Sequence, residues 1–252
     1  MFFSRLVRAI GIIVLCFLSA FVILLFSWLP RGGVYSFVSR KIWGPGLLWC
    51  AGAKLIVEGE ENIEGKAHGI YFSNHQSNFD IPALTAALRT PLYFIAKKEI
   101  KKIPIFGWGM WAIGMVFVDR KNSEKARKSM EQGAKVVKGG KSLSTFPEGT
   151  RSKTGEIQAF KKGTFHLAKS GPIMLIPVAI IGTRNIQRPG GKLQIGQKVI
   201  IRIGQPISEE EVDALSLNDL TKHAREKIIE LMGENQDADL HEKTNTLNLP
   251  KN

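Results

Sequence analysis

The strongest constraint on this chain is an uncharged apolar run of 21 residues near its start, at residues 9–29. As a helix rising about 1.5 Å per residue, such a run covers roughly the 30 Å hydrocarbon core of a bilayer. It therefore predicts a membrane-anchoring helix. A cleaved signal peptide is the competing interpretation, because Arg5 and Arg8 precede the run. Against it, the run is longer than the usual apolar core of a signal peptide, and no small-residue cleavage site follows.

A second apolar stretch, residues 34–52, follows the breaker PRGG and is interrupted by Arg40, Lys41 and Pro45. These interruptions favour a helix at the membrane interface over one that spans, and an ordinary amphipathic core helix is the alternative. Basic residues flank the first run on both sides, so they do not orient it. If the first run entered one leaflet and the second stretch returned, both ends would stay on the cytoplasmic side. We expect residues 1–52 to form the membrane anchor.

Residues 53–232 have the pattern of an α/β domain. Seven short apolar runs indicate strands, and several are apolar at consecutive positions, as in strands covered on both faces. These runs lie at residues 54–59, 69–74, 92–97, 115–120, 142–147, 173–182 and 198–204. Helical patterns occupy 81–89, 123–140, 162–171 and about 217–232. Active residues of such a domain lie in loops at strand ends, and the polar residues 233–252 are expected to form a disordered tail.

The charge of the chain points to anionic partners. A formal net charge of +13 on 252 residues suits nucleic acid, anionic lipid headgroups or phosphorylated substrates, and charge alone does not choose among them. The two cysteines, Cys16 and Cys50, both lie in apolar stretches. A disulfide framework is therefore not expected, and reducing surroundings are the simpler assumption.

A candidate general base lies in the stretch SNHQSNFD, residues 73–80, which follows an apolar strand and precedes a helix. Histidine is the side chain whose unperturbed pKa lies nearest neutrality, and a carboxylate bonded to one ring nitrogen leaves the other free to accept a proton. His75 would be the base and Asp80 the residue that orients it. A nucleophilic Ser77 is the weaker alternative, because the chain has no G-x-S-x-G elbow.

A candidate anion site lies in FPEGTRS, residues 146–152, a turn after an apolar strand. Its Arg151 can donate two parallel hydrogen bonds to a phosphate, which a lysine does less well. The helix that follows, with Lys161 and Lys162 at its start, would favour the same anion. A solvated surface turn is the plainer interpretation of any one such loop.

The stretch from residue 97 to residue 120 is dense in cations, aromatic residues and glycine. It suits a surface that skims the membrane, with Lys98 and Arg120 directed at a headgroup. Alternatively, Trp108, Trp111 and Phe117 are core residues and the lysines are solvated. We expect the core interpretation to hold for Phe117 and to fail for at least one tryptophan.

Taken together, four blocks identify a family. NHQSNFD, GMVFVDR, FPEGTRS and IPVAI occur in this order, and the region from about residue 55 to residue 204 resembles the glycerolipid acyltransferases. The resemblance implies a mixed central sheet flanked by helices, with an N-terminal hydrophobic anchor. It also implies that an acyl group passes directly from an acyl-CoA or acyl carrier protein thioester to the sn-2 hydroxyl of lysophosphatidic acid, giving phosphatidic acid. No cofactor, metal or covalent acyl-enzyme is then needed.

The resemblance also assigns residues. It makes His75 the general base and Asp80 its orienting partner, whereas Gly114, Phe117 and Arg120 match the second block and Ile176 and Pro177 the fourth. Substrate contacts are expected from Lys98, Arg120, Glu148, Gly149, Thr150 and Arg151. The expected location is the bacterial inner membrane, with the catalytic domain on the cytoplasmic face.

Three other functions are weighed against this one. A non-catalytic membrane adaptor that binds anionic lipid would not need His75 or Asp80. Nucleic-acid binding is disfavoured, because the basic residues are spread among apolar segments and no nucleic-acid-binding motif is present. A sister acyltransferase that acts on glycerol 3-phosphate or on another lysophospholipid is the serious alternative.

Overall fold

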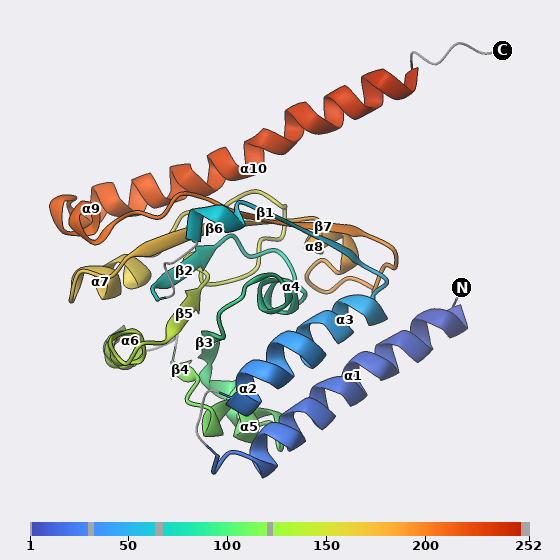
Figure 1. Ribbon diagram of the computed structural model, residues 1–252, viewed down its shortest axis with the longest axis horizontal. Coiled ribbons are helices and arrows are strands. Elements are labelled where there is room, and N and C mark those ends of the chain that lie inside the picture. The colour runs from blue at the N-terminus through green and yellow to red at the C-terminus, as the bar shows by residue number, and fades with distance from the viewer. Residues whose placement is uncertain (1, 30–32, 64–67, 120–122, 248–252) are drawn as a thin grey trace.

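The computed structural model describes residues 2–29, 33–63, 68–119 and 123–247, and its centre is a seven-stranded sheet (Figure 1). The strand order is β1-β7-β6-β2-β5-β3-β4, and every neighbouring pair is parallel except β6 and β7. The bounds are β1 Lys54–Glu58, β2 Ile70–Ser73, β3 Leu92–Lys97, β4 Val116–Val118, β5 Ser142–Thr145, β6 Leu175–Ile181 and β7 Lys198–Ile203. The expected mixed sheet flanked by helices is confirmed.

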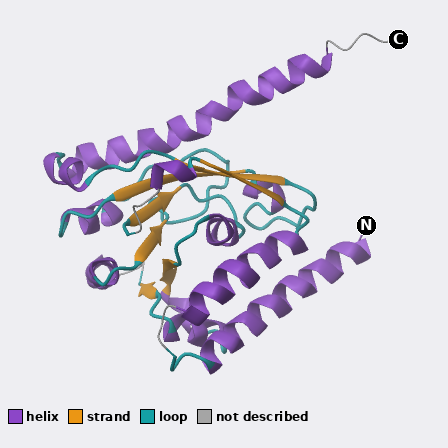
Figure 2. Cartoon of the chain, viewed as in Figure 1, coloured by secondary structure: helices purple, strands orange, loops and turns teal. Residues whose placement is uncertain are grey.

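Each of the seven apolar runs contains one strand, because helices cover the sheet on both faces. On one face lie α6 (Ser123–Lys138), α7 (Gly163–Lys169) and the start of α10 (Leu217–Leu247). On the other lies α4 (Asp80–Ala87), with the N-terminal helices packed behind it (Figures 1 and 2). The core between these layers includes Tyr71, Phe72, Tyr93 and Phe165, all less than 2% exposed.

The N-terminal segment is a helical hairpin. Its first arm is α1 (Phe2–Leu25), and the second consists of α2 (Gly33–Phe37), a π-helical stretch η1 (Val38–Trp43) and α3 (Gly44–Cys50). The arms are antiparallel, since Arg8 near the start of α1 donates from Nη1 to the carbonyl of Cys50, 2.9 Å away. Arg40 donates from Nε to Leu88 O at 3.0 Å. Arg8 and Arg40, which lie on opposite sides of the apolar run in the sequence, are therefore both engaged within the protein.

Helix α1 presents apolar side chains to the outside. Residues Ser4–Leu25 are long and apolar enough to cross a membrane by length and composition. Its exposed stripe includes Val7, Ile10, Val14, Phe17 and Phe21, each between 40% and 52% exposed. The stripe is the surface that a membrane would cover.

Several short helices were not expected from the sequence. They are η2 (Glu60–Ile63), η3 (Lys98–Lys102), α5 (Phe106–Ala112), α8 (Thr183–Ile186) and α9 (Glu209–Ala214). Helix α10 runs to Leu247, so the end predicted near Met232 is wrong: residues 234–247 are polar but contain neither glycine nor proline. The division into anchor, acyltransferase domain and tail stays a prediction.

The topology brings three loops to one edge of the sheet. Strands β6, β2, β5, β3 and β4 are mutually parallel, so their carboxyl ends share an edge, where open α/β sheets bind ligands. Strand β2 lies between β6 and β5. The loop after β2, residues 74–79, is therefore flanked by residues 146–152 after β5 and residues 182–187 after β6.

Candidate active site

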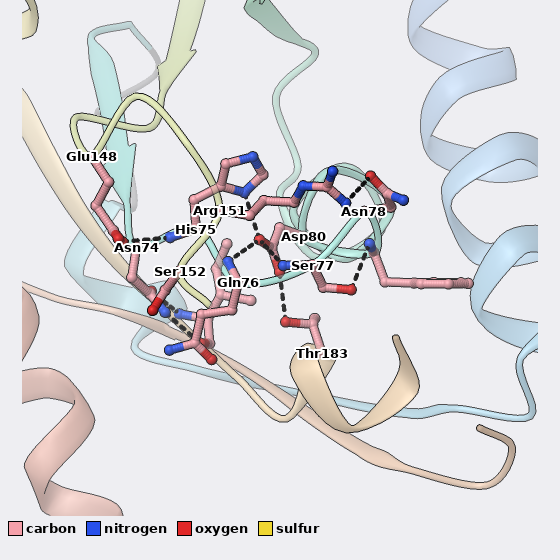
Figure 3. Close-up of polar contacts among 12 residues, drawn as sticks. Asn74, His75, Gln76, Ser77, Asn78, Asp80, Glu148, Arg151, Ser152 and Thr183 are labelled. Atoms are coloured by element: carbon pink, nitrogen blue, oxygen red, sulfur yellow. Dashed lines mark hydrogen bonds and ion pairs between the residues drawn. The ribbon is translucent and has the colours of Figure 1, made fainter. Parts of the chain in front are cut away.

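His75 and Asp80 form the centre of the site. Strand β2 ends at Ser73, and the loop returns so that Asp80 begins α4. The Nδ1 atom of His75 lies 2.7 Å from Asp80 Oδ2. Because a carboxylate accepts, Nδ1 carries the hydrogen and the other ring nitrogen, Nε2, presents a lone pair. The predicted pairing of these two side chains is therefore present in the structure (Figure 3).

The carboxylate of Asp80 is fully buried, and four donors surround it. Besides His75, the backbone N–H groups of Gln76 and Ser77 donate to Oδ2 at 2.7 and 2.9 Å. The hydroxyl of Thr183 donates to Oδ1 at 2.5 Å. A buried charge is stable only when its hydrogen-bonding capacity is met, and here both oxygens have donors.

The face of the His75 imidazole is in contact with the protein as well. Its ring stacks on Phe146 with centroids 4.0 Å apart and planes 16° from parallel, and the side chain is 16% exposed. Stacking and the bond to Asp80 together leave the ring one orientation, as a base that must meet a substrate hydroxyl requires.

The loop after β5 is hydrogen-bonded to the backbone of His75. Glu148 Oε1 accepts from His75 N at 2.8 Å, and Ser152 N donates to His75 O at 2.8 Å. The second oxygen of Glu148, Oε2, accepts from the backbone and side chain of Gln158 at 3.3 and 3.0 Å. Glu148 is 3% exposed. This position suits support of the loop that carries His75 more than the substrate contact expected of Glu148.

Burial raises the pKa of Glu148, against the opposing effect of its hydrogen bonds from His75 and Gln158. A carboxyl whose pKa rises on folding stabilises the fold most below its ordinary pKa, and this contribution is lost as pH rises through the folded pKa. We therefore expect the melting temperature of the wild type, relative to that of Glu148→Gln, to fall as pH rises from about 4 to 7. Glu209→Gln, a change at an exposed carboxyl, is the control. If the melting temperature of the wild type rose with pH relative to that of Glu148→Gln, the raised pKa of Glu148 would be contradicted.

Arg151 completes the polar group at this edge. Its Nη1 donates to Asn78 Oδ1 at 2.8 Å, and Asn78 Nδ2 donates to Gln187 Oε1 at 3.3 Å. Neither amide was identified from the sequence. Their placement at the ends of β2 and β6 is the signal that could have found them, since both follow strands that share one edge.

An apolar cavity of about 660 Å³ adjoins these residues. His75, Asn78, Arg151 and Gln187 supply a polar part of its wall, whereas most of the lining from α1, β3 and α5 is apolar. The cavity lies between the α/β domain and the N-terminal hairpin. A histidine paired with a buried carboxylate, a guanidinium and an apolar cavity of this size therefore meet in one place.

The other expected substrate contacts are distributed differently. Lys98 donates to Asp119 Oδ2 at 2.6 Å, which raises the pKa of Lys98, and the neighbouring Lys97 lines the cavity instead. Thr150 is exposed and Gly149 partly so. Arg120 lies outside the described residues. Of the five expected contacts that the structure describes, Arg151 is thus the one that lies in the cavity wall with His75.

Two other chemistries can be assessed from the geometry. Ser77 is buried, and its hydroxyl donates to Gln187 O at 2.7 Å while accepting from Phe79 N at 3.1 Å. It is therefore engaged as a structural residue rather than poised as a nucleophile. Within the described residues, no three histidine, cysteine, aspartate or glutamate side chains are grouped as a metal site requires.

The fold and the paired His75 and Asp80 define an α/β protein with a hydrogen-bonded histidine and carboxylate beside an apolar cavity. Comparison with known proteins then identifies its class: residues 54–181 match the model of the family described as Acyltransferase. The chain belongs to this acyltransferase family, as the sequence blocks implied.

Individual relatives support the same assignment. A 1-acyl-sn-glycerol-3-phosphate acyltransferase of Saccharomyces cerevisiae is 35% identical over 186 residues, which are 73% of this chain and 61% of the yeast protein. One of Borreliella burgdorferi is 30% identical over 182 residues, 72% of this chain and 73% of that protein. The chain thus spans about three fifths of the yeast relative.

A solved structure matches nearly the whole chain. The crystal structure of the 1-acyl-sn-glycerophosphate (LPA) acyltransferase PlsC from Thermotoga maritima superposes with a TM-score of 0.72 at 28% sequence identity. The match covers 91% of this chain and 98% of that one. At least part of the N-terminal hairpin is therefore included in the similarity, since a match confined to residues after 52 could not reach that coverage.

Proposed function

We propose that this protein transfers a fatty acyl group from a thioester to the sn-2 hydroxyl of 1-acyl-sn-glycerol 3-phosphate, forming phosphatidic acid. The observation that carries the proposal is that His75, ordered by Asp80, and Arg151 share the wall of one apolar cavity. The names of the relatives supply the acceptor. A non-catalytic adaptor would have no use for a histidine fixed by a buried carboxylate.

The chemistry follows from the orientation of His75. Its Nε2 takes the proton of the acceptor hydroxyl, and the hydroxyl oxygen attacks the thioester carbonyl to give a tetrahedral intermediate. The intermediate collapses with cleavage of the C–S bond, and the imidazolium returns the proton to the departing thiolate. Asp80 stabilises the imidazolium while it carries that proton. No residue of the chain is acylated in this sequence.

The charged and apolar parts of the substrates go to different parts of the site. Arg151 is suited to the acceptor phosphate, because a guanidinium can donate two parallel hydrogen bonds to it. The apolar cavity is suited to a fatty acyl chain, whose burial is favourable at about 25 cal/mol per Å² of surface. We infer that the acyl donor is acyl-CoA or acyl carrier protein, and that neither a cofactor nor a metal takes part.

The proposal is tested by assaying the purified protein with a panel of acceptors, each with acyl-CoA and with acyl carrier protein as donor. The acceptors are lysophosphatidic acid, glycerol 3-phosphate and lysophospholipids with larger headgroups. We expect the highest kcat/KM with lysophosphatidic acid, and a fall in kcat/KM once the donor chain exceeds what the cavity holds. A higher kcat/KM with another acceptor would reassign the substrate. If no acceptor received an acyl group, the proposed activity would be refuted. If kcat/KM were equal at all donor chain lengths, the proposal that the cavity holds the acyl chain would be refuted.

We also propose that the catalytic domain works at the cytoplasmic face of the bacterial inner membrane. Support comes from the apolar stripe of α1 and from the hairpin, whose two arms leave both ends beside the α/β domain. Trp108 and Trp111 of α5 are 50% and 60% exposed, whereas Phe117 packs on the core. Lys101 lies over the Trp111 ring, 5.1 Å from its centroid. Exposed tryptophan beside lysine is typical of membrane interfaces.

Replacing Ile10, Val14 and Phe17 together by asparagine should lower the membrane-bound fraction at least about tenfold. Each large apolar side chain contributes about 1.5–3 kcal/mol when fully buried, and three are removed. Sedimentation with vesicles of bacterial lipid measures the fraction. Ile229→Asn is the control, since Ile229 is 41% exposed on α10, across the sheet from α1 (Figure 1). Unchanged sedimentation of the triple variant would show that the stripe does not face lipid.

A further inference from the structure

The segment after β6, Gly182 to Gln187, touches both loops of the site although it belongs to none of the four sequence blocks. Arg184 donates to the carbonyls of Ser152 and Lys153 at 3.1 and 2.6 Å, and thereby holds the end of the loop after β5. The carbonyl of Gln187 accepts from Ser77 Oγ at 2.7 Å, and thereby holds the loop after β2. One short segment thus fastens both loops to the sheet.

Thr183 is the member of this segment that reaches the catalytic pair. It begins α8, and its hydroxyl donates to Asp80 Oδ1 at 2.5 Å (Figure 3). Both side chains are 0% exposed, so water cannot replace this donor without rearrangement. Gly182 precedes it with a φ of 87°, and a Cβ there would lie 2.1 Å from Lys198 O. Only glycine fits the turn that aims Thr183 at Asp80.

The two oxygens of Asp80 have different partners. Oδ2 accepts hydrogen bonds from His75 Nδ1 and from the backbone N–H groups of Gln76 and Ser77. Among the described residues, Thr183 is the one donor to Oδ1. The bond to Oδ1 therefore fixes rotation of the carboxylate about its Cβ–Cγ bond, and that rotation sets whether Oδ2 lies in the plane of the imidazole.

We propose that Thr183 is a positioning residue, which holds the carboxylate of Asp80 in the plane that orients His75 for proton transfer. The inference rests on the proposed function. A purely structural threonine would affect stability alone, because removing a buried hydroxyl leaves its acceptor without a donor and destabilises the fold. A positioning threonine affects kcat and leaves substrate binding nearly unchanged, because misplacing a reacting group acts on the chemical step.

The test compares Thr183→Val, which is nearly isosteric but lacks the hydroxyl, with Thr183→Ser, which keeps it. We expect Thr183→Val to lower kcat about 10- to 100-fold, with KM for each substrate within about twofold. Thr183→Ser should recover kcat to within about threefold. Thr145→Val is the matched control, since Thr145 is 3% exposed and its hydroxyl has no hydrogen-bond partner among the described residues. Melting temperatures of all variants separate folding from catalysis, and Thr183→Ala replaces Thr183→Val should the latter not fold.

A second measurement is independent of acyl transfer: the rate at which diethyl pyrocarbonate modifies His75, followed by mass spectrometry. We expect this rate to change in Thr183→Val and to match wild type in Thr183→Ser and Thr145→Val. A folded Thr183→Val protein with wild-type kcat and wild-type modification rate would overturn the inference, as would a Thr183→Ser protein as slow as Thr183→Val. If the wild type transfers no acyl group, the proposed function fails, and the modification rates alone decide the role of Thr183.

Discussion

Replacing His75 by alanine is expected to lower acyl transfer by about 10²- to 10⁴-fold, the usual contribution of a positioned general base. The loss should appear in kcat, because the imidazole acts on the proton and not on substrate binding. The side chain is partly exposed and stacks on Phe146, so its truncation leaves a folded protein. Initial rates with saturating acyl donor and acceptor measure the effect.

His166→Ala is the matched control, because His166 is an exposed histidine on α7. It should retain wild-type activity. If a folded His75→Ala protein kept most of its activity, the general-base role would have to be abandoned.

Asp80→Asn probes the same pair from the other side. The amide keeps the shape of the carboxylate but offers one acceptor oxygen where four donors converge on two. A substantial loss of kcat, of about 10²-fold or more, is expected because His75 is no longer held in the required tautomer. Some loss of stability, about 1–3 kcal/mol, should accompany it, since buried donors are left without an acceptor.

Much of the fold could be predicted because its strands are locally encoded. Runs such as LYFIAK and KVIIRI are apolar at consecutive positions, and their burial on both faces requires that composition. Helix α5 shows the limit of this reasoning. Its sequence GWGMWA is poor in helix formers, because each glycine costs about 1 kcal/mol relative to alanine in a helix interior. Its packing on α1 overrides propensity: a Cβ on Gly109 would lie 2.9 Å from Ala20 O.

The pairing of His75 with Asp80 could be predicted from the sequence, whereas much of the rest of the site could not. His75 and Asp80 are five residues apart and carry a local signal, whereas Thr183 acts on Asp80 across 103 residues. No local pattern encodes such a contact. It follows from β6 and β2 being parallel neighbours, which places their carboxyl ends side by side. Knowledge of the strand order would therefore have been needed to predict Thr183, Asn78 and Gln187 as parts of the site.

The distribution of cations could not be predicted from composition either. Strand β3 lies two positions from β2 in the sheet, about 10 Å away at the usual strand spacing, and Lys98 at its end pairs with Asp119. Strand β5 is the immediate neighbour of β2. The loop after β5 therefore brings Arg151, rather than Lys98, to the cavity wall beside His75. Proximity along the sheet, and not the number of basic residues in a stretch, determines that Arg151 rather than Lys98 lies in the cavity wall with His75.

Arg151 should accordingly dominate recognition of the acceptor phosphate. Replacing it by alanine is expected to weaken binding of lysophosphatidic acid by about 1.5 to 3 kcal/mol, the range for hydrogen bonds to charged groups, or roughly 10- to 150-fold. Affinity for the acyl donor should change much less. Arg151→Lys keeps the charge but loses the two-pronged geometry, so it should fall between the wild type and Arg151→Ala.

The measurement is the apparent affinity for each substrate in the same variant, with the other substrate saturating. Arg89→Lys is the matched control, because Arg89 is an exposed arginine whose side chain pairs with Glu60 at 3.3 Å, away from the cavity lining. It makes the same change of guanidinium to ammonium without touching the site, so both affinities should stay at wild-type values. If the Arg151 variants instead bound the acyl donor more weakly and lysophosphatidic acid normally, Arg151 would contact the phosphates of the donor, and its assignment to the acceptor would be given up.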